Sequence, residues 1–384
     1  MNTLFVSMSR YPEGNGADVL RLESIISLFK QNGDNVFVIS RGETTNFQIK
    51  RNGTHRYISF RSRENSFVRR LCDLLLYTSY LNEFLGKSKT NWDRIVIHGA
   101  PNSAIKFLKG FAKKRDIELI YDCVEWYSKE EYKLGRFNYE YIARNHLITK
   151  IIDHQFKVIS ISTYLEKYFK SRGIKTVRIP VILDVENIKY KKRKIENKLV
   201  IMYAGNPGGK DALDVMINGF RLLTDSEKEQ IEFRIVGVDW NWIKKKYHYS
   251  ATQIEEMNRY IRVYGRVNRD YVRELMEETD FSILLRPENL RYAKAGFPTK
   301  VVESLANGTP VICNLTSDLG MYIKEGYNGK VVAGCDENSL MIVLENVLKV
   351  DLGYLFQAQK NARLSAEKYF VLYSFSGQFG KFIN

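Results

Sequence analysis

Hydrophobic residues in the first half of the chain alternate between short strand-like runs and a longer helix-like stripe. Thr3–Met8 is apolar and β-prone, and Ala17–Gln31 repeats apolar side chains at helical spacing. Gly33 suits the left-handed stop of that helix, and Asn35–Ser40 is the next predicted strand. This β-α-β order predicts a parallel sheet with right-handed crossovers. Later strands are predicted at Arg94–His98, Glu118–Tyr121 and Lys157–Ser162.

The same alternation starts again in the second half. Strands are predicted at Lys198–Ala204, Glu232–Val238, Arg262–Tyr264, Phe281–Leu285 and Pro310–Asn314. Helices are predicted at Ala212–Leu223, at Asn268–Glu278 with Asn268 as N-cap, at Pro298–Ala306 and from near Asp336. Between the halves, Pro180–Lys198 is polar, lacks periodicity and is the best linker candidate. Two doubly wound α/β domains are therefore expected, with ligands at the carboxyl ends of the strands.

Length and composition agree with two globular domains. The chain has 384 residues, of which 44% are hydrophobic and 27% charged. No run approaches the ~18–20 apolar residues of a membrane-spanning helix, and the first residues lack the pattern of a signal peptide. The cysteines are scattered and form no C-x-x-C pair: Cys72, Cys123, Cys313 and Cys335. They predict neither a zinc site nor a disulfide framework and favour a reducing cytosol.

The net charge of +15 is unevenly distributed, with +12 in residues 1–180 and +3 in the remainder. Such an excess attracts anionic membranes, nucleic acids or phosphorylated substrates, and an ordinary solvated surface explains it equally well. Within this half, Ser66–Tyr80 combines Arg69 and Arg70 with a dense apolar stripe. The stripe fits either a helix in a membrane interface or a helix that faces the core.

The segment Phe281–Asn314 carries the most specific chemistry. A buried strand leads into a polar loop, and Pro298 is expected in the first turn of the following helix, where its missing N–H is harmless. Lys300 lies in the same turn, where the unfavourable interaction of a cation with the helix dipole costs roughly 0.3–1 kcal/mol. An anion at the helix N-terminus would reverse that effect. Glu303 is one turn further on and suits the hydroxyls of a ribose, although a surface ion pair with Lys300 is the alternative.

The stretch AGFPTKVVESLANGTPVI, residues 295–312, resembles the donor-binding motif of family 4 retaining glycosyltransferases with the GT-B fold. Weaker blocks occur in the family's order: PEGNG (12–16), ISISTYL (159–165), RIPVILD (178–184), YAGNPGGKD (203–211) and GYNGKV (326–331). The resemblance implies two Rossmann-like domains, with acceptor binding in 1–183 and donor binding in 184–365. It also implies that a C-terminal helix at about 366–384 packs back on the first domain.

The resemblance also implies roles for single residues. Lys210 is the cation on the donor diphosphate, which suits lysine as a point charge beside phosphate. Gly16 allows the first loop to approach the diphosphate closely, and Glu303 binds the ribose. The complete implied donor-binding set is Gly16, Gly205, Asn206, Lys210, Arg266, Arg286, Gly296, Phe297, Thr299, Lys300 and Glu303.

Three departures from the family pattern affect these roles. Ala295 replaces the first Glu of the family's E-x7-E motif, and Asn206 replaces an arginine of the phosphate loop, whose charge Arg266 or Arg286 is a candidate to supply. The family histidine after the fourth strand is replaced within YDCVEW (121–126).

Asp122 and Glu125 of that segment are therefore candidates to orient or deprotonate an acceptor hydroxyl. The alternative is that Asp122 caps a loop and Glu125 is a surface residue. With Lys210, these two residues form the predicted catalytic set.

Other chemistries are disfavoured. The histidines have no H-E-x-x-H or equivalent spacing and no D-x-D occurs, so no metal is expected and no cofactor is predicted. His98 ends a predicted strand, either at the ligand edge or as a structural residue. Val19 stands where a dinucleotide fold needs its third glycine, and Arg41 ends the second strand in place of a ribose-binding acid, which argues against an oxidoreductase.

The predicted activity is metal-independent, retaining transfer of a hexose from a nucleotide-sugar to a sugar or lipid-linked saccharide acceptor, in surface polysaccharide or glycolipid assembly. The expected location is the cytoplasm, with peripheral association with an anionic inner membrane face left open. Two alternatives remain: a GT-B-fold nucleotide-sugar epimerase, and a basic nucleic-acid-binding protein. Because aromatic and basic residues do not interleave, no nucleic-acid partner is expected.

Overall fold

The computed structural model describes residues 1–384 except 15, 43–48, 62–66, 189 and 191–197; at 61 and 67–75 it describes the backbone alone. It divides into two compact units. The first comprises Met1–Lys129, Lys133–Ile182 and Leu372–Asn384, and the second comprises Glu130–Tyr132 and Leu183–Val371. Most of the predicted linker run YKKRKIENK lies outside the described residues, as do the side chains of Arg69 and Arg70, on which the membrane-interface alternative depended.

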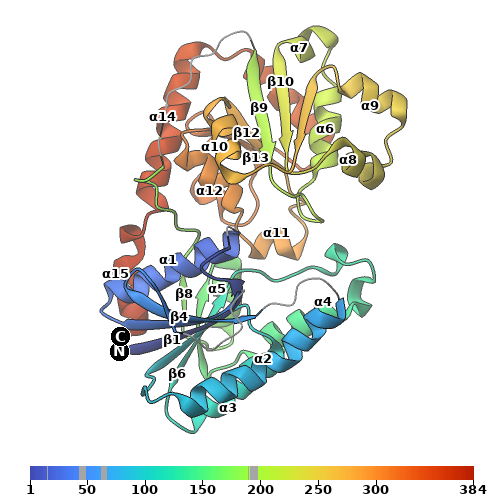
Figure 1. The fold of residues 1–384 in the computed structure, drawn as a ribbon. Coiled ribbons are helices and arrows are strands. Elements are labelled where there is room, and N and C mark those ends of the chain that lie inside the picture. Colours follow the sequence, from blue (N-terminus) through green and yellow to red (C-terminus); the bar gives the residue numbers. More distant parts are fainter. Residues whose placement is uncertain (15, 43–48, 62–66, 189, 191–197) are drawn as a thin grey trace. The chain divides into compact units, whose positions relative to one another are not determined.

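The first unit contains an eight-stranded sheet within the described residues, in the order β3-β4-β2-β1-β5-β6-β7-β8 (Figure 1). All neighbours are parallel except the β3–β4 hairpin. The strands are β1 (Asn2–Arg10), β2 (Asn35–Gly42), β3 (Lys50–Asn52), β4 (His55–Arg61), β5 (Arg94–His98), β6 (Glu118–Cys123), β7 (Phe156–Ser160) and β8 (Thr176–Arg178).

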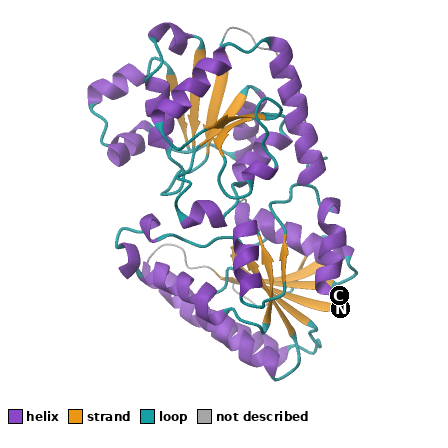
Figure 2. Ribbon diagram, turned by 180° about the vertical axis from the view of Figure 1, so that it is seen from behind, coloured by secondary structure: helices purple, strands orange, loops and turns teal. Residues whose placement is uncertain are grey.

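Helices cover both faces of this sheet (Figures 1 and 2). They are α1 (Ala17–Gln31), α2 (Phe67–Lys87), α3 (Asn102–Lys113), α4 (Tyr139–His146), α5 (Thr163–Ser171) and α15 (Tyr373–Ile383). Short 3₁₀ segments cover Lys129–Glu131 and Gly135–Phe137, and a π-helical segment covers Leu147–Ile151. Residues 67–80 of the apolar stripe thus lie in α2, and Ser66 lies outside the described residues.

The second unit contains a six-stranded parallel sheet in its described residues, in the order β11-β10-β9-β12-β13-β14. Its strands are β9 (Leu199–Ala204), β10 (Ile231–Val236), β11 (Ile261–Gly265), β12 (Phe281–Leu284), β13 (Val311–Asn314) and β14 (Gly329–Val332). The helices are α6 (Leu213–Arg221), α7 (Asp225–Glu229), α8 (Trp240–Tyr247), α9 (Ala251–Met257), α10 (Arg269–Glu277), α11 (Arg291–Ala295), α12 (Thr299–Ala306), α13 (Glu337–Leu348) and α14 (Leu352–Tyr369), with a 3₁₀ turn at Leu319–Met321.

The prediction of two doubly wound, Rossmann-like parallel sheets is confirmed by these strand orders. In each sheet the order reverses once, between β1 and β5 in the first unit and between β9 and β12 in the second. The position where the strand order reverses is the switch point of the sheet. The connections on its two sides lead away from each other and leave a crevice at the carboxyl ends of the strands, where ligands of open α/β sheets bind. Each unit therefore has one preferred place for a ligand.

The C-terminal segment consists of two helices where the sequence suggested one at about 366–384. Helix α14 ends at Tyr369, and Phe370, fully buried, packs its ring against Tyr322 at a centroid distance of 4.7 Å. Helix α15 then joins the first unit, where Phe379 packs edge-on against Phe29 of α1 at 4.9 Å. The anchoring of Phe370 explains the break.

Helix α12 also starts one residue later than predicted. Pro298 is its N-cap, with extended backbone angles of φ −77° and ψ 105°. The predicted N-cap Asn268 is confirmed, because its side chain accepts a hydrogen bond from the Tyr271 N–H at 2.8 Å. Strand and helix limits elsewhere differ from the predicted ones by one or two residues, mostly at the fraying ends.

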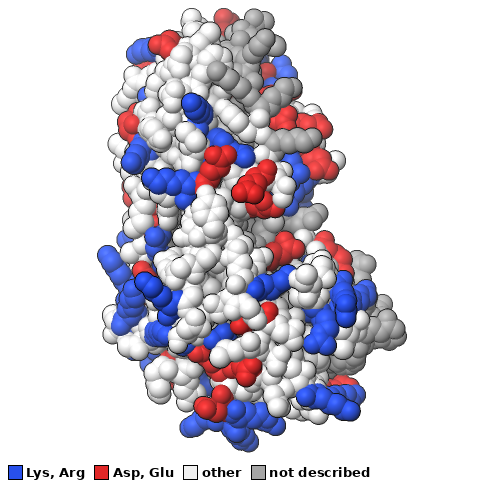
Figure 3. Space-filling model, turned by 90° about the vertical axis from the view of Figure 1, so that its left-hand side faces the viewer, with Lys and Arg blue, Asp and Glu red and all other residues white. Residues whose placement is uncertain are grey.

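The surface gives two observations on membrane contact. Among the described residues, no helix is both long enough and apolar enough to cross a membrane. On the face drawn in Figure 3, the described Lys and Arg side chains lie in separate groups interspersed with Asp and Glu. The basic excess seen in the sequence is thus not gathered into one continuous surface on that face.

Candidate donor site and acceptor-side cluster

Loops from three strands meet at the switch point of the second unit. The Ala212 N–H, after β9, donates to the Leu285 carbonyl, after β12, at 2.9 Å. The Arg286 N–H donates to the Asn314 side-chain oxygen at the end of β13, at 3.0 Å. The backbone is therefore fixed where the side chains of the candidate site converge.

Asp211 is the centre of a buried cluster at this point. Its carboxylate, with 2% of the side chain exposed, accepts hydrogen bonds from Arg286 Nε at 2.8 Å and from the Tyr203 hydroxyl at 2.8 Å. The ammonium of Lys300 forms an ion pair with the same carboxylate and donates to the Tyr203 hydroxyl at 2.8 Å. Two cations thus share one anion, and the cluster keeps a net charge of +1.

The pKa shifts agree with these pairings. Burial by itself would raise the pKa of Asp211, but the charges of Arg286 and Lys300 outweigh it and hold that pKa below the ordinary value. Burial lowers the pKa of Lys300 despite the attraction of Asp211. Burial also raises the pKa of Tyr203 far above its ordinary value, so its hydroxyl stays protonated. The excess positive charge is held in a region of low dielectric, where it attracts an anion more strongly than in water.

The N-terminus of α12 adds to this attraction. Its N-cap Pro298 makes no side-chain capping hydrogen bond, so the first N–H groups of the helix have no side-chain acceptor at that position. Lys300 lies in this first turn, and its charge is compensated by Asp211 across the switch point. Unsatisfied N–H groups and the helix dipole are the features with which helix N-termini bind phosphate.

Glu303, predicted to bind the ribose, lies one turn further along α12. Burial raises the pKa of its carboxyl, and the charges of Arg269, Lys300 and Arg273 oppose that rise. The alternative of a surface ion pair with Lys300 does not fit, because the ion pair of Lys300 is made with the buried Asp211. The ribose contact itself stays a prediction.

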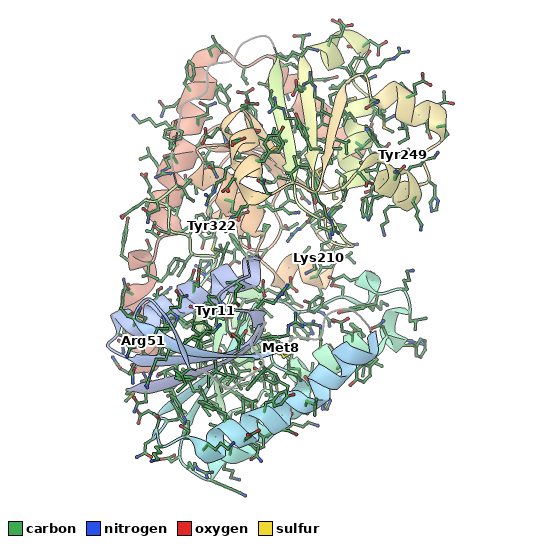
Figure 4. All side chains as sticks on the ribbon, viewed as in Figure 1. Met8, Tyr11, Arg51, Lys210, Tyr249 and Tyr322 are labelled. Atoms are coloured by element: carbon green, nitrogen blue, oxygen red, sulfur yellow. The ribbon has the colours of Figure 1, made fainter. Side chains whose placement is uncertain are left out.

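The loop after β9 carries Lys210 (Figure 4). The Lys210 side chain is 28% exposed, and its ammonium lies 3.9 Å from the carboxylate of Glu131. Its carbonyl accepts the Tyr292 hydroxyl at 2.7 Å, which fixes the loop. Asn206 is exposed and its side chain accepts the Gly208 N–H at 3.1 Å, so it shapes the turn in this structure.

Gly205 is required by the packing of Lys300. Its φ is +134°, and a Cβ at this position would lie 2.3 Å from Cε of Lys300. We expect Gly205→Ala to cost ~1–3 kcal/mol through backbone strain and to displace Lys300 from Asp211. The melting temperature and the affinity for the nucleotide of the predicted donor should both fall.

The matched control is Gly86→Ala in α2, where nothing lies within 4 Å of the added Cβ. Alanine is favoured over glycine in a helix by ~1 kcal/mol, so this variant should be as stable as the wild type or more so. A Gly205→Ala variant with the melting temperature and nucleotide affinity of the wild type would show that Lys300 has room to move.

Of the other residues predicted to bind the donor, some lie in the cluster around Asp211 and others do not. Arg286 joins the cluster, whereas Arg266 is exposed after β11 and makes no hydrogen bond or ion pair within the described residues. The Gly296 N–H donates to the Tyr292 carbonyl at 2.9 Å, and the place of Gly296 at the donor stays a prediction. The Phe297 ring is buried against Tyr322 at 5.6 Å.

Three further positions complete the predicted set. Thr299 is half-buried as the first residue of α12. Ala295, in place of the family's first Glu, is buried. Gly16 is the exposed N-cap of α1 in the first unit, and a Cβ there would lie 2.3 Å from the Asp18 carboxylate. Its closeness to a donor diphosphate stays a prediction.

In the first unit, Asp122 is held by two partners. Arg21 of α1 donates to both carboxylate oxygens, at 2.8 and 3.2 Å, and His98 Nδ1 lies 2.8 Å from Oδ2. Burial would raise the pKa of Asp122, but Arg21 and His98 lower it to about 2. A carboxylate with so low a pKa is a weak base, and the role of Asp122 toward an acceptor hydroxyl stays a prediction. Glu125 is half-buried, with its carbonyl 3.9 Å from the Cys123 sulfur.

Sequence reasoning missed Asp211, Tyr203 and Arg21. Two signals were present: Asp211 directly follows the lysine of the phosphate loop, and Arg21 lies beside Leu22 on the apolar stripe of α1, where a charge needs a buried partner. Within the described residues, no three or more His, Cys, Asp or Glu side chains are grouped so as to hold a metal ion.

Comparison with known proteins gives one match to a family model and a set of similar solved structures. Residues 184–367 match the family model of group 1 glycosyl transferases. No significant match to a curated protein was found.

Solved structures are similar over the whole chain. Sucrose-phosphate synthase from Thermosynechococcus elongatus has a TM-score of 0.75 at 14% identity, covering 100% of this chain and 98% of that one. HepE from Anabaena, in complex with UDP and glucose, has a TM-score of 0.69 at 15% identity, with 100% and 99% covered. WaaG, a glycosyltransferase involved in lipopolysaccharide biosynthesis, has a TM-score of 0.66 at 17% identity, also with 100% and 99% covered. The chain has the GT-B fold.

Proposed function

We propose that the protein is a glycosyltransferase that moves a sugar from a nucleotide-sugar donor to a hydroxyl acceptor. The observation that carries the proposal is the cluster of Arg286 and Lys300 on the buried Asp211, at the N-terminus of α12 and the switch point of the second sheet. A nucleotide-sugar has a diphosphate between its nucleoside and its sugar, and it leaves as a nucleotide with growing negative charge. Fixed positive groups stabilise such charge most strongly when they are held in place before the reaction.

Each part of the donor has a candidate partner in the second unit. The diphosphate is bound by Lys210, Lys300, Arg286 and the first N–H groups of α12, and the ribose by Glu303. Group 1 similarity over residues 184–367 coincides with this unit and supports the assignment. HepE was solved with UDP-glucose, which makes UDP the first nucleotide to test.

The finer features of the proposal come from the motif resemblance. We expect a hexosyl donor, retention at the anomeric carbon and no requirement for a metal, because the cluster supplies cationic side chains where a metal would otherwise neutralise the diphosphate. A sugar or lipid-linked saccharide of a surface polysaccharide or glycolipid is the proposed acceptor. The proposed location is the cytoplasm, with peripheral contact with an anionic membrane face.

A thermal-shift series tests the donor site. Because a ligand that binds only the folded state stabilises it by RT ln(1 + [L]/Kd), saturation at about 100 Kd should contribute about 2.7 kcal/mol. We expect UDP and one UDP-sugar to raise the melting temperature, UMP to raise it less and uridine hardly at all, with the same result in EDTA. GDP, ADP, CMP and dTDP, with their sugars, serve as comparison nucleotides.

The outcomes separate the parts of the proposal. A shift that disappears in EDTA would contradict metal independence and leave the donor class intact. Equal shifts with uridine and UDP would contradict the diphosphate site. Absence of any shift with all nucleotides and nucleotide-sugars would contradict the proposed function.

A further inference from the structure

Arg41 is the penultimate residue of β2, at the carboxyl edge of the first sheet. Strand β2 pairs with β1, which borders the switch point of this sheet, and Arg41 is in register with Arg10 at the end of β1. In doubly wound folds, the side chain at the end of the second strand contacts the ligand that is bound at the switch point. Arg41 therefore lies within reach of a ligand of the first unit, and the proposed function gives it no role.

Arg41 lies on the face of the sheet that α2 covers. Side chains alternate between the two faces along a strand, and Phe37, four residues before Arg41, packs against Phe84 of α2 at a ring-centroid distance of 5.3 Å. Phe60, the register partner of Arg41 in β4, packs against Tyr77 of α2 at 5.7 Å. The neighbours of Arg41 across the sheet are thus an arginine on one side and an aromatic layer on the other.

Among the described residues, Arg41 is a cation without a counter-charge. Its side chain is half-buried, and its Nε atom is completely buried without a hydrogen-bond partner. Within the same part of the chain, its guanidinium forms no ion pair either. Buried cations are normally paired, and in this unit Arg21 is paired with Asp122 and Arg94 with Asp34. An unpaired cation at the ligand edge of a sheet indicates that its anion belongs to a ligand.

We propose that Arg41 binds a phosphate group of the acceptor. This inference rests on the proposed function, because it names the chemical class of the second substrate of the same reaction. A guanidinium is charged at every physiological pH, and its planar set of N–H donors matches the oxygens of a phosphate. In dinucleotide-binding folds, an arginine near the end of the second strand likewise binds a phosphate, where a carboxylate binds hydroxyls. The charge of +12 in residues 1–180 agrees with a phosphorylated ligand.

Phosphate binding to the full chain tests the proposal. The donor site is first saturated with the nucleotide that gives the thermal shift. In ¹H-¹⁵N spectra, the Nε–H signal of Arg41, identified by its absence in Arg41→Gln, should move as inorganic phosphate is titrated at constant ionic strength. Arg41→Gln should weaken phosphate binding roughly 10- to 100-fold, because a charge-assisted hydrogen bond is lost. Arg41→Lys keeps the charge without the planar donors and should give an intermediate affinity.

The matched control is Arg51→Gln, which makes the same change of charge at an exposed arginine of β3 in the same unit (Figure 4). This variant should bind phosphate as the wild type does. Because Arg41 lies in the first unit and the donor cluster in the second, Arg41→Gln should also keep the thermal shift by the donor nucleotide.

The melting temperature separates ligand binding from a structural role. A half-buried cation without a partner does not stabilise the fold, so Arg41→Gln should melt at the wild-type temperature or slightly above it. A ligand that binds only the folded state stabilises it, so phosphate should raise the melting temperature of the wild type more than that of Arg41→Gln.

Two further arms identify the source of the phosphate. Glucose 1-phosphate and glucose 6-phosphate, compared with glucose, represent a free sugar phosphate. Vesicles of phosphatidylcholine with phosphatidic acid, compared with phosphatidylcholine alone, represent a lipid headgroup. Binding that is lost in Arg41→Gln and kept in Arg51→Gln supports the proposal, and the arm in which this loss occurs names the source.

Equal phosphate affinity of the wild type and Arg41→Gln, or an Arg41 Nε–H signal that does not move, would overturn the inference. So would a melting temperature of Arg41→Gln several degrees below the wild type with an unchanged response to phosphate. A wild type that binds no nucleotide or nucleotide-sugar would contradict the proposed function instead. The comparison of phosphate affinities between the wild type and Arg41→Gln, made then on the free protein, is independent of that result.

Discussion

Lys210→Ala is expected to lower kcat roughly 100- to 1000-fold, the range observed when one fixed group that stabilises developing negative charge is removed. The Lys210 side chain is 28% exposed and its ammonium is 3.9 Å from the carboxylate of Glu131, whose side chain is 6% exposed. Because the buried carboxylate loses a nearby cation, the melting temperature should fall by a few degrees, with the fold retained. Steady-state kinetics with the identified nucleotide-sugar measure the effect.

Lys294→Ala is the matched control, since Lys294 is an exposed lysine on the neighbouring helix α11. It should keep wild-type kcat and donor affinity. If Lys210→Ala retains kcat within threefold of the wild type while UDP still binds, the diphosphate is held by Arg286, Lys300 and the helix N-terminus without Lys210. That result would remove Lys210 from the predicted catalytic set.

Asp211→Ala is expected to destabilise the protein by about 3–5 kcal/mol, because removing one partner of a buried ion pair leaves uncompensated charge. Here two cations lose their anion: Arg286, with 12% of its side chain exposed, and Lys300, with 27%. The Tyr203 hydroxyl loses its acceptor as well. Urea unfolding at pH 7 followed by circular dichroism measures the change as a lower midpoint.

The control for Asp211 is Asp270→Ala, which removes an 88% exposed carboxylate 3.8 Å from Arg273; such pairs contribute about 0–1 kcal/mol. The pH dependence gives a second check. The lowered pKa of Asp211 means that its contribution is present above the ordinary carboxyl pKa of ~4 and is lost as the pH falls below it. The wild type and Asp211→Ala should thus converge in stability under acid. Equal stability at pH 7 would show that water or nearby acceptors compensate both cations.

The sequence predicted the local structure well because the relevant signals are local. Apolar runs and the helical spacing of Ala17–Gln31 predicted a strand-helix-strand unit, and α1 has these bounds. The Asn268 N-cap depends on a backbone N–H three residues away, so the residues of that one helical turn are enough to predict where the helix begins. The break before α15 was not predictable in the same way, because it depends on Phe370 packing against Tyr322.

For the candidate site, the sequence identified the segment and not the partners. It placed Lys300 in the first turn of a helix, where a cation is unfavourable without a counter-charge. A bound anion was therefore expected to compensate the charge of Lys300. The structure provides Asp211, 89 residues earlier in the chain, as the internal partner. It likewise pairs Asp122 with Arg21, 101 residues earlier, and the charge of Arg21 contributes to the low pKa of this carboxyl.

The amino-acid sequence by itself determined the alternation of strands and helices, the two parallel sheets and the loop-to-helix segment that is proposed to meet the donor. Each of these follows from spacing within about twenty residues, where periodicity and capping act. Only the tertiary structure decided which charges are compensated, since the order of the strands brings the ends of β9 and β12, and of β5 and β6, to neighbouring positions. Protonation and net charge at the two switch points depend on those long-range neighbours, because Coulomb energies are set by distance and burial and not by position along the chain.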